Sequence, residues 1–250
     1  MKTLIAVPVT ERGVWRLSKR LPGLVKRYGS IALPLPQSLC VKVVTSFTEA
    51  LDYAFKLMKP AGFRVWSSLL HVLKDTVIGY PDVDIGCYTS EDTYAVSEAR
   101  GYSIAALSVK AKAFNIVKPE EWLDVFKGSH SEMIVERIAK YDAIVADGYS
   151  WTVRLKSEIK PAKVLVLDTL IPTPFDILEL MALGYLDTSI AREVIAYAVK
   201  YVDYIVTSFT LTQAYDKLLK DESYLELLKE LKLKVYRVKE GLSSLNHQSL

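Results

Sequence analysis

Two short apolar runs flank a helix-sized segment near the middle of the chain, and this arrangement most constrains the fold. The first run covers residues 142–147 and stops at Gly148, and the second covers residues 163–168. Nearly continuous apolar runs are typical of strands in a sheet that is covered on both faces. Residues 149–160 are long enough for a crossover helix, and Pro161 ends it. The segment therefore predicts a right-handed β-α-β unit with parallel strands.

Other segments extend this unit to an α/β fold with an open, mostly parallel sheet and covering helices, a Rossmann-like layering. Residues 4–9 and 30–36 predict two N-terminal strands, residues 63–70 a third, and residues 234–238 a closing strand. Residues 76–89 are rich in glycine, proline and aspartate, so they predict a loop.

Residues 90–140 hold several helical patterns between the predicted third and fourth strands, and we expect a helical insertion or lid there. We expect residues 1–242 to form a single α/β domain and residues 243–250 to form a disordered tail. Residues 202–208 fit two interpretations. They echo the strand at residues 142–147, and they also continue the 3.6-residue period of the preceding helix; we prefer the helix.

Composition excludes some classes of partner. The net charge is only +3, and the basic residues near the N-terminus spread around a helix, so we expect no nucleic-acid binding. The scarcity of thermolabile amides, together with abundant lysine, glutamate and tyrosine, indicates a hyperthermophilic source. The amide side chains are Gln37, Asn115, Gln213, Asn246 and Gln248.

The chain carries no pattern typical of export or of membrane insertion. The apolar run after Met1 is too short for a signal peptide, and no run reaches the roughly 18 residues that span a bilayer. We therefore expect a cytoplasmic protein without a membrane partner. Cys40 and Cys87 are isolated, so reduced and packed thiols are the preferred interpretation. A disulfide stays open as the alternative, because intracellular disulfides occur in hyperthermophiles.

Residues 147–151 follow the first apolar run and form the strongest candidate site, because ligands bind at the carboxyl ends of parallel strands. Asp147 can act as a base or bind a hydroxyl group, and Gly148 allows a ligand to approach the backbone. Ser150 can cap the next helix and leave its N–H groups for an anion. Tyr149 and Trp151 can stack on a ring. The alternative is structural: Asp147 or Ser150 caps the helix, and the aromatic rings belong to the core.

Two further segments should reach the same edge of the sheet. Asp168 and Thr169 end the second apolar run, and Thr10, Glu11 and Arg12 follow the first strand of the chain. Paired carboxylates can divide the acid and base roles of a reaction. We therefore assign the catalytic role to Asp147, Asp168 and Glu11, and ligand binding to Thr10, Arg12, Gly148, Tyr149, Ser150, Trp151 and Thr169.

The residues indicate neither a metal nor a named cofactor. His71, His130 and His247 lie far apart in the sequence, and none belongs to a metal-binding motif. Glycine-rich nucleotide loops and the G-x-S-x-G nucleophile motif are also missing from the sequence.

Three stretches resemble the superfamily that includes TraB, the haem-binding lipoprotein ChaN and the erythromycin esterases. They are the first strand with residues 28–36, Glu120–Glu121–Trp122 with Met133 and Ile138, and the C-terminal helices around residues 182–184 and 214–215. The resemblance implies a divergent member of that superfamily.

The chain departs from that superfamily at its motif positions. A Gly-x-x-His-like turn is replaced by residues 10–13, an acidic residue by Leu35, and an Arg-Asp pair by Ser129 and His130. The family mechanism therefore does not transfer, and two hypotheses follow. One is a hydrolase- or transferase-like enzyme that binds a small molecule in the crevice. The other is a non-catalytic binding or assembly protein, such as a homo-oligomer, on a degenerate enzyme scaffold.

Overall fold

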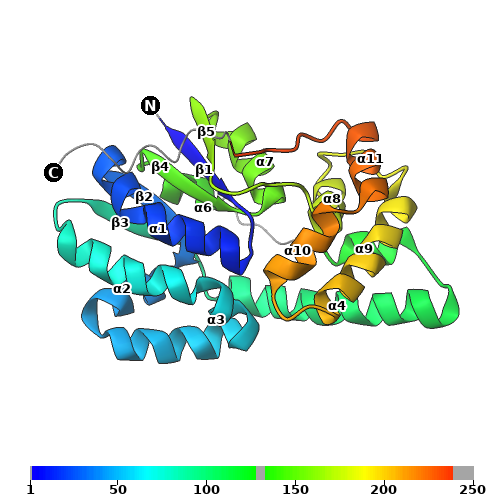
Figure 1. The fold of residues 1–250 in the computed structure, drawn as a ribbon, viewed down its shortest axis with the longest axis horizontal. Coiled ribbons are helices and arrows are strands. Elements are labelled where there is room, and N and C mark those ends of the chain that lie inside the picture. The colour runs from blue at the N-terminus through cyan, green and yellow to red at the C-terminus, as the bar shows by residue number, and fades with distance from the viewer. Residues whose placement is uncertain (1, 128–132, 239–250) are drawn as a thin grey trace.

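The computed structural model describes residues 2–127 and 133–238 of the chain, and it confirms the α/β fold (Figure 1). Five parallel strands form one sheet in the order β3-β2-β4-β1-β5. The strands are β1 (Thr3–Val7), β2 (Ser30–Pro36), β3 (Asp84–Thr89), β4 (Ala143–Asp147) and β5 (Lys163–Val166).

Helices make up most of the remaining described residues. They are α1 (Glu11–Tyr28), α2 (Gln37–Thr45), α3 (Phe47–Gly79), α4 (Asp92–Phe114), α5 (Pro119–Asp124), α6 (Met133–Ile138), α7 (Tyr149–Ile159), α8 (Pro174–Ala182), α9 (Ala191–Val206), α10 (Leu211–Leu219) and α11 (Glu222–Glu230).

The strands alternate their side chains between two covered faces, as the apolar runs predict. On one face Ile5 and Val145 pack in the core formed with α1, α2 and α3. On the other face Leu4 and Ile144 pack against α7 residues such as Leu155. The β-α-β unit is confirmed as β4, α7 and β5, although β1 lies between its two strands.

A second core lies beside the sheet and consists of helices. Helices α8, α9, α10 and α11 pack together with α5, and Trp122 and Phe126 are buried among them. Helix α4 runs along the lower edge of Figure 1 from the sheet side to this helical core. The described part of residues 90–140 contains the helices α4, α5 and α6, which lie between β3 and β4 in the sequence.

The predicted strand at residues 63–70 is wrong, because these residues belong to α3. The buried positions are Val65, Trp66, Leu69, Leu70 and Leu73, which follow the helical period of 3.6 residues. The aromatic and β-branched residues in this stretch gave a misleading strand signal.

The predicted loop at residues 76–89 is also wrong, because it contains the end of α3 and all of β3. Asp84 and Gly86 are poor strand formers, so local propensity hides the strand. Tertiary packing explains the glycine: a Cβ at Gly86 would collide with the ring of Tyr141. The closing strand is reduced to one antiparallel bridge between Leu170 and Tyr236.

The open alternatives are resolved for two segments. Residues 202–206 are the last turn of α9, which confirms the helical interpretation. Cys40 and Cys87 form a disulfide between α2 and β3, so the preference for reduced thiols is wrong. Their spacing of 47 residues gave no indication that the fold brings them together. The predicted tail at residues 243–250 lies outside the described residues.

Candidate functional site

The candidate site lies at the carboxyl ends of β1 and β4, which are neighbours in the sheet. The chain leaves β1 toward α1 on one face and leaves β4 toward α7 on the other. Such a divergence opens a crevice at the edge of a parallel sheet. Val9, just after β1, and Asp147, at the end of β4, line both of the cavities found there.

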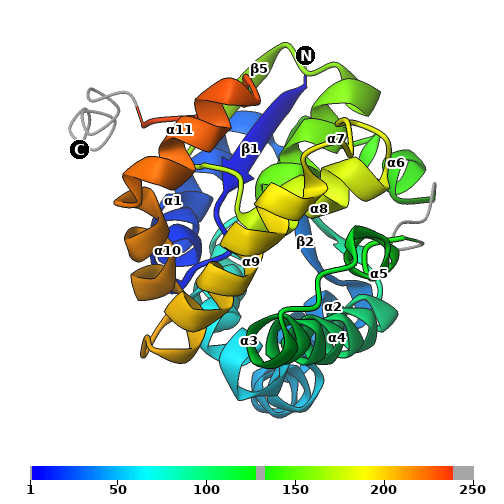
Figure 2. The same cartoon turned by 90° about the vertical axis from the view of Figure 1, so that its right-hand side faces the viewer.

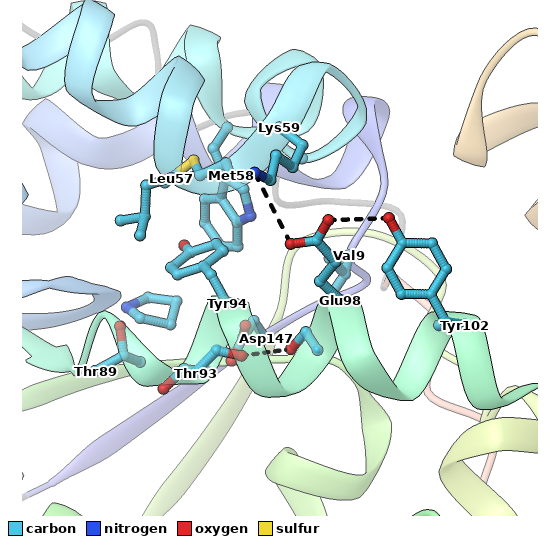
Figure 3. Close-up of a pocket in the computed structure, with 15 residues that line it drawn as sticks. Val9, Leu57, Met58, Lys59, Thr89, Thr93, Tyr94, Glu98, Tyr102 and Asp147 are labelled. Carbon is cyan, nitrogen blue, oxygen red and sulfur yellow. Dashed lines mark hydrogen bonds and ion pairs between the residues drawn. The ribbon is translucent and has the colours of Figure 1, made fainter.

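The larger cavity, which we name the α3–α4 cavity, has a volume of about 580 Å³ (Figure 3). Its walls come from the kinked middle of α3 and the first half of α4, and its floor comes from the strand ends. Pairing between β2 and β4 ends at Ala32, and Pro34, just beyond that point, lines the cavity. The lining residues are Val9, Pro34, Leu57, Met58, Lys59, Gly62, Trp66, Thr89, Thr93, Tyr94, Ser97, Glu98, Gly101, Tyr102 and Asp147.

The smaller cavity, which we name the α8–α9 cavity, has a volume of about 330 Å³ and lies on the other side of Asp147. Of the predicted site residues, it is lined by Thr10, Asp147, Gly148, Tyr149 and Ser150. The structure therefore brings these five residues together around one crevice. The remaining lining comes mainly from α8, α9 and α10.

Asp147 is half-buried and its carboxyl group lies where the two cavities meet. Burial, together with the nearby charges of Glu179 and Asp176, raises the pKa of this carboxyl from 3.8 to about 7. A carboxyl group with a pKa near 7 can both accept and donate a proton at neutral pH.

Thr89 supplies a second polar group to the floor of the α3–α4 cavity. Thr89 is only 9% exposed, and its hydroxyl oxygen is buried. This oxygen has no hydrogen-bond partner among the described residues. Buried hydroxyl groups are almost always paired with protein, water or ligand. Thr89 ends β3 and lines the same cavity as Asp147 (Figure 3). The sequence prediction missed Thr89 because it assigned this segment to a loop.

Lys59 lies at the wall of the cavity in a strained backbone conformation, with φ of 57° and ψ of 169°. This region is occupied almost only by glycine, and such strain tends to occur at functional sites. Its Nζ atom lies 3.9 Å from Glu98 of α4, which also accepts a hydrogen bond from Tyr102 (Figure 3). Lys59, Glu98 and Tyr102 were not predicted, because their grouping depends on the packing of α3 against α4.

The predicted anion site at the start of α7 is occupied by the protein itself. The backbone N–H of Ser150 donates to Asp176 Oδ1 over 2.9 Å, and the Ser150 hydroxyl donates to Glu179 Oε2 over 2.6 Å. Asp176 also accepts from the N–H and the hydroxyl of Thr173, which caps α8. Ser150 and Asp176 therefore join α7 to α8, and the N-cap residue of α7 is Gly148 rather than Ser150.

Gly148 has the conformational role that the sequence predicts. Its φ of +89° is in the left-handed region, and its N–H donates to the carbonyl of Val7 over 2.8 Å. This turn reverses the chain directly after Asp147 and fixes the carboxyl group at the end of β4.

Tyr149 and Trp151 are core residues. Trp151 packs on the face of the sheet that α7 covers, beside Leu4 and Ile144. Its Nε1 donates to the hydroxyl of Tyr88, which in turn donates to the carbonyl of Val145. Tyr149 packs against Ala6 and Leu180 and is only 2% exposed. The structural alternative therefore holds for Trp151, and Tyr149 reaches the α8–α9 cavity only as part of its wall.

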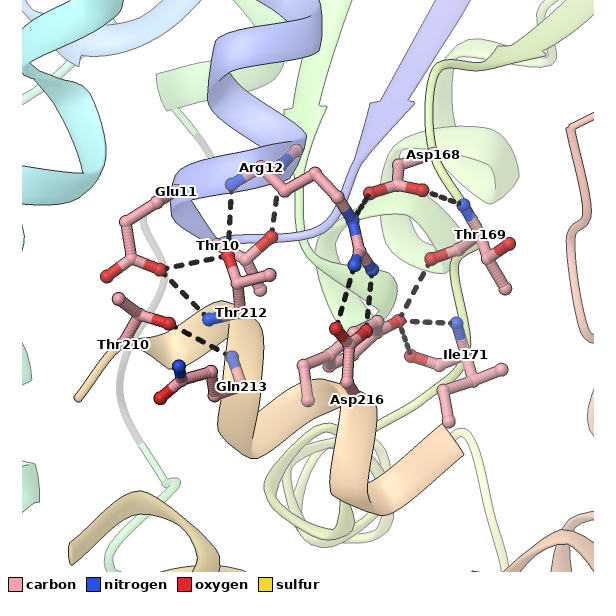
Figure 4. A network of polar contacts seen from close by, with 12 residues as sticks. Thr10, Glu11, Arg12, Asp168, Thr169, Ile171, Thr210, Thr212, Gln213 and Asp216 are labelled. Carbon is pink, nitrogen blue, oxygen red and sulfur yellow. Dashed lines mark hydrogen bonds and ion pairs between the residues drawn. The ribbon is translucent and has the colours of Figure 1, made fainter. Parts of the chain in front are cut away.

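The remaining predicted residues form an ion-pair network that joins α1 to α10 (Figure 4). Arg12 donates through Nε to Asp168 over 2.8 Å and through both terminal nitrogens to Asp216. Arg16 binds the second oxygen of Asp168, which also accepts the N–H of Thr169. Asp168 is 3% exposed and fully engaged, so the network is a structural connection between helices.

Glu11 is part of the same connection. Its carboxylate accepts the backbone N–H and the hydroxyl of Thr212 at the N-terminus of α10 (Figure 4). It also accepts the backbone N–H of Leu211. These hydrogen bonds lower the pKa of Glu11, while its partial burial acts in the opposite direction. The carboxylate thus stabilises the helix terminus. Thr212, which binds both Glu11 and Arg12, and Asp216, which binds Arg12, lie about 200 residues away in the sequence and gave no local signal.

No group of three or more histidine, cysteine or acidic side chains in the described part of the chain has a geometry that could hold a metal ion. Among the same residues, no helix is both long and apolar enough to cross a membrane. The chain matches no family model, and no curated protein or solved structure is significantly similar to it.

Proposed function

We propose that the α3–α4 cavity binds a small organic molecule and that Asp147 is its general acid–base residue. The support is one juxtaposition: a carboxyl group with a pKa near 7 and an unpaired buried hydroxyl, Thr89, line the same cavity at the strand ends. Catalytic pKa values near the working pH make proton transfer efficient. The reaction class that fits this pair is hydrolase- or transferase-like.

The ligand that fits has an apolar or aromatic body with one polar end. Trp66, Met58, Leu57 and Tyr94 supply apolar walls, and Asp147 supplies a proton donor or acceptor at the floor. A mostly apolar pocket with few polar groups is typical of small-molecule sites. Lys59 and Glu98 lie between α3 and α4 and are placed to bind charged or polar substituents.

The first experiment compares native and denaturing mass spectra of the freshly purified protein with those of two variants, in each of which one glycine is replaced by phenylalanine. Gly101 lines the cavity and a Cβ there would enter open space, so Gly101→Phe should fill the cavity without disturbing α4. Gly23 lies in α1 with the same open surroundings outside both cavities, so Gly23→Phe is the matched control. We expect a retained molecule, or fragments added in a ligand-detected NMR screen, to bind wild type and Gly23→Phe but not Gly101→Phe. Equal binding by all three proteins would contradict the proposal.

A non-catalytic binding or assembly protein is the second candidate, on the scaffold of a degenerate member of the TraB, ChaN and erythromycin esterase superfamily. It is favoured by the structural use of Asp168 and Glu11, because of the three predicted catalytic carboxylates Asp147 alone lines the α3–α4 and α8–α9 cavities. Asp147→Asn separates the two candidates. Loss of turnover with retained ligand binding supports the enzyme, and unchanged pH dependence of binding supports the second candidate.

A further inference from the structure

The α8–α9 cavity has an acidic lining. Three carboxyl groups line it, from Asp147 at the end of β4 and from Asp176 and Glu179 of α8. Among the described residues that form its wall, none is a lysine, an arginine or a histidine. Much of this wall comes from α8, α9 and α10, which lie on the side of the molecule that faces the viewer in Figure 2. The cavity therefore lies within one helical layer beside the sheet.

The protein itself supplies a cation to only one of these three carboxyl groups. Glu179 Oε1 lies 3.5 Å from Arg100 Nη1, and the charge of Arg154 also acts on Glu179. The hydrogen bonds to Asp176 come from neutral groups. Within the described part of the chain, neither Asp147 nor Asp176 forms an ion pair with a basic side chain. Burial raises the pKa of both, as expected for carboxyl groups without a cation beside them.

Two polar groups that line the cavity also lack a hydrogen-bond partner. The carboxyl group of Asp147 is hydrogen-bonded only to its own backbone N–H among the described residues. Tyr201 is 6% exposed, and its hydroxyl group has no hydrogen bond to another described residue. Burial and the charge of Asp176 raise the pKa of this hydroxyl, which indicates that it lies near the acidic groups. Because buried polar groups are almost always paired with protein, water or ligand, both groups point to an occupant of the cavity.

The rest of the lining is rich in aromatic rings. Four helices each contribute one ring, namely Tyr149 of α7, Phe175 of α8, Tyr201 of α9 and Tyr215 of α10. The ring centroids of Phe175 and Tyr201 lie 5.5 Å apart at a tilt of 55°. The faces of aromatic rings attract cations, and aromatic cages are typical of sites for organic ammonium ions. A metal ion would instead need several oxygen or nitrogen ligands, and the described residues supply no such group.

We propose that the α8–α9 cavity binds an organic ammonium ion. The carboxylate of Asp147 neutralises its charge, the hydroxyl of Tyr201 accepts one of its N–H groups, and the aromatic rings surround its alkyl part. The volume of about 330 Å³ is at the lower end of the range for ligand pockets, so the ligand is a small amine. This site lies on the other side of Asp147 from the α3–α4 cavity, and the inference does not require a ligand in that cavity.

Three ligands with the same five-carbon chain test the charge preference. They are n-pentylammonium, n-pentanol and pentanoate, titrated by ligand-detected NMR at pH 8. At this pH the carboxyl of Asp147, with a pKa of about 7, is mostly ionised, and an alkylammonium ion keeps its proton. We expect the ammonium ion to bind about tenfold or more tightly than either of the other two. Equal affinity for the ammonium ion and the alcohol, or a preference for the anion, overturns the proposal.

A substitution that fills the cavity tests its location. Ile205 lines the α8–α9 cavity but not the α3–α4 cavity, so Ile205→Trp should abolish binding of n-pentylammonium. Val206→Trp is the matched control, because Val206 is the next residue of α9 and is 77% exposed. Gly101→Phe, which fills the α3–α4 cavity, should leave ammonium binding unchanged. Loss of ammonium binding in Gly101→Phe but not in Ile205→Trp overturns the proposal while supporting a ligand in the α3–α4 cavity.

Two nearly isosteric substitutions test the groups that hold the ammonium ion. Asp147→Asn should lower the affinity for n-pentylammonium by about tenfold or more and leave that for n-pentanol unchanged. Tyr201→Phe should lower the ammonium affinity by about threefold, the effect of one lost hydrogen bond. Tyr197→Phe, at another position of α9 outside both cavities, is the control. Circular dichroism verifies that each variant is folded. Wild-type ammonium affinity in a folded Asp147→Asn variant overturns the proposal.

Discussion

Arg12 Nε lies 2.8 Å from Asp168 Oδ2, and this ion pair indicates a structural role for Asp168, which the sequence predicted to be catalytic. Arg16 lies 2.8 Å from the other oxygen of the same carboxylate. Both guanidinium groups belong to α1, whereas Asp168 follows β5. The ion pairs therefore fix α1 to the edge of the sheet at the place where a ligand was expected.

Asp168→Asn should lower stability rather than abolish ligand binding. The substitution removes the charge that two arginines share, and hydrogen bonds to charged groups contribute about 1.5–3 kcal/mol. We expect a loss of about 2 kcal/mol in the free energy of unfolding by urea titration. Asp75→Asn, at an exposed position of α3, is the control. A stable variant with lost binding would return Asp168 to the functional site.

The pKa of Asp147 predicts a pH dependence of stability. The folded protein holds a proton on this carboxyl up to about pH 7, whereas the unfolded chain releases it near 3.8. Stability should therefore fall as the pH rises from about 4 to about 7 and then become constant. Asp147→Asn should remove much of this slope. At pH 8 its free energy of unfolding should exceed that of wild type by about 2–4 kcal/mol.

Urea unfolding at a series of pH values between 4 and 8 measures this effect. Asp176 has a raised pKa for the same reason, so a smaller slope of the same sign remains in the variant. Identical slopes for wild type and Asp147→Asn would show that Asp147 is ionised throughout.

The disulfide between Cys40 and Cys87 should contribute substantially to stability. It closes a chain segment of 47 residues, and in the chain-entropy model such a loop stabilises the fold by about 4 kcal/mol. Reduction, or the double variant Cys40→Ser with Cys87→Ser, should lower the unfolding midpoint by the corresponding amount. Mass spectrometry with a thiol-alkylating reagent confirms the redox state, and full alkylation without prior reduction would contradict the bridge.

Lys59→Gly should stabilise the protein, because glycine adopts the left-handed backbone of this position without strain. We expect a gain of about 1 kcal/mol in the free energy of unfolding. Lys59→Ala is the comparison, since it also removes the Glu98 contact but keeps a Cβ atom. Equal effects of the two substitutions would show that the backbone at Lys59 is not strained. A loss of ligand binding in both variants would assign the lysine to the site.

Gly86→Ala should destabilise the sheet edge, because the added methyl group meets the ring of Tyr141. Overpacking of this kind costs about 1–3 kcal/mol. Gly79→Ala is the matched control, because a Cβ at this end of α3 meets nothing within 4 Å. Thermal unfolding of the two variants measures the difference, and a wild-type midpoint for Gly86→Ala would contradict the packing.

The local sequence pattern determined the class of fold and the position of Asp147 at the end of a strand. The continuous apolar runs of β4 and β5 predict buried parallel strands, because each residue of such a strand must face a covered layer. The position of Asp147 at the end of β4, followed by Gly148 with its positive φ, also follows from the local sequence. These features depend on neighbours within a few residues, so the sequence alone determined them.

Tertiary structure decided the partners of each polar group. Asp168 meets Arg12 across 156 residues, and Ser150 meets Glu179 across 29. Thr89, Lys59 and Glu98 line the α3–α4 cavity only because β3, α3 and α4 pack around the end of β4. Residues 63–70 are a helix for the same reason, since α3 buries one face against α1 and α2. Contacts between distant segments decide which carboxylate is neutralised by an ion pair and which faces a cavity, and no local pattern encodes that choice.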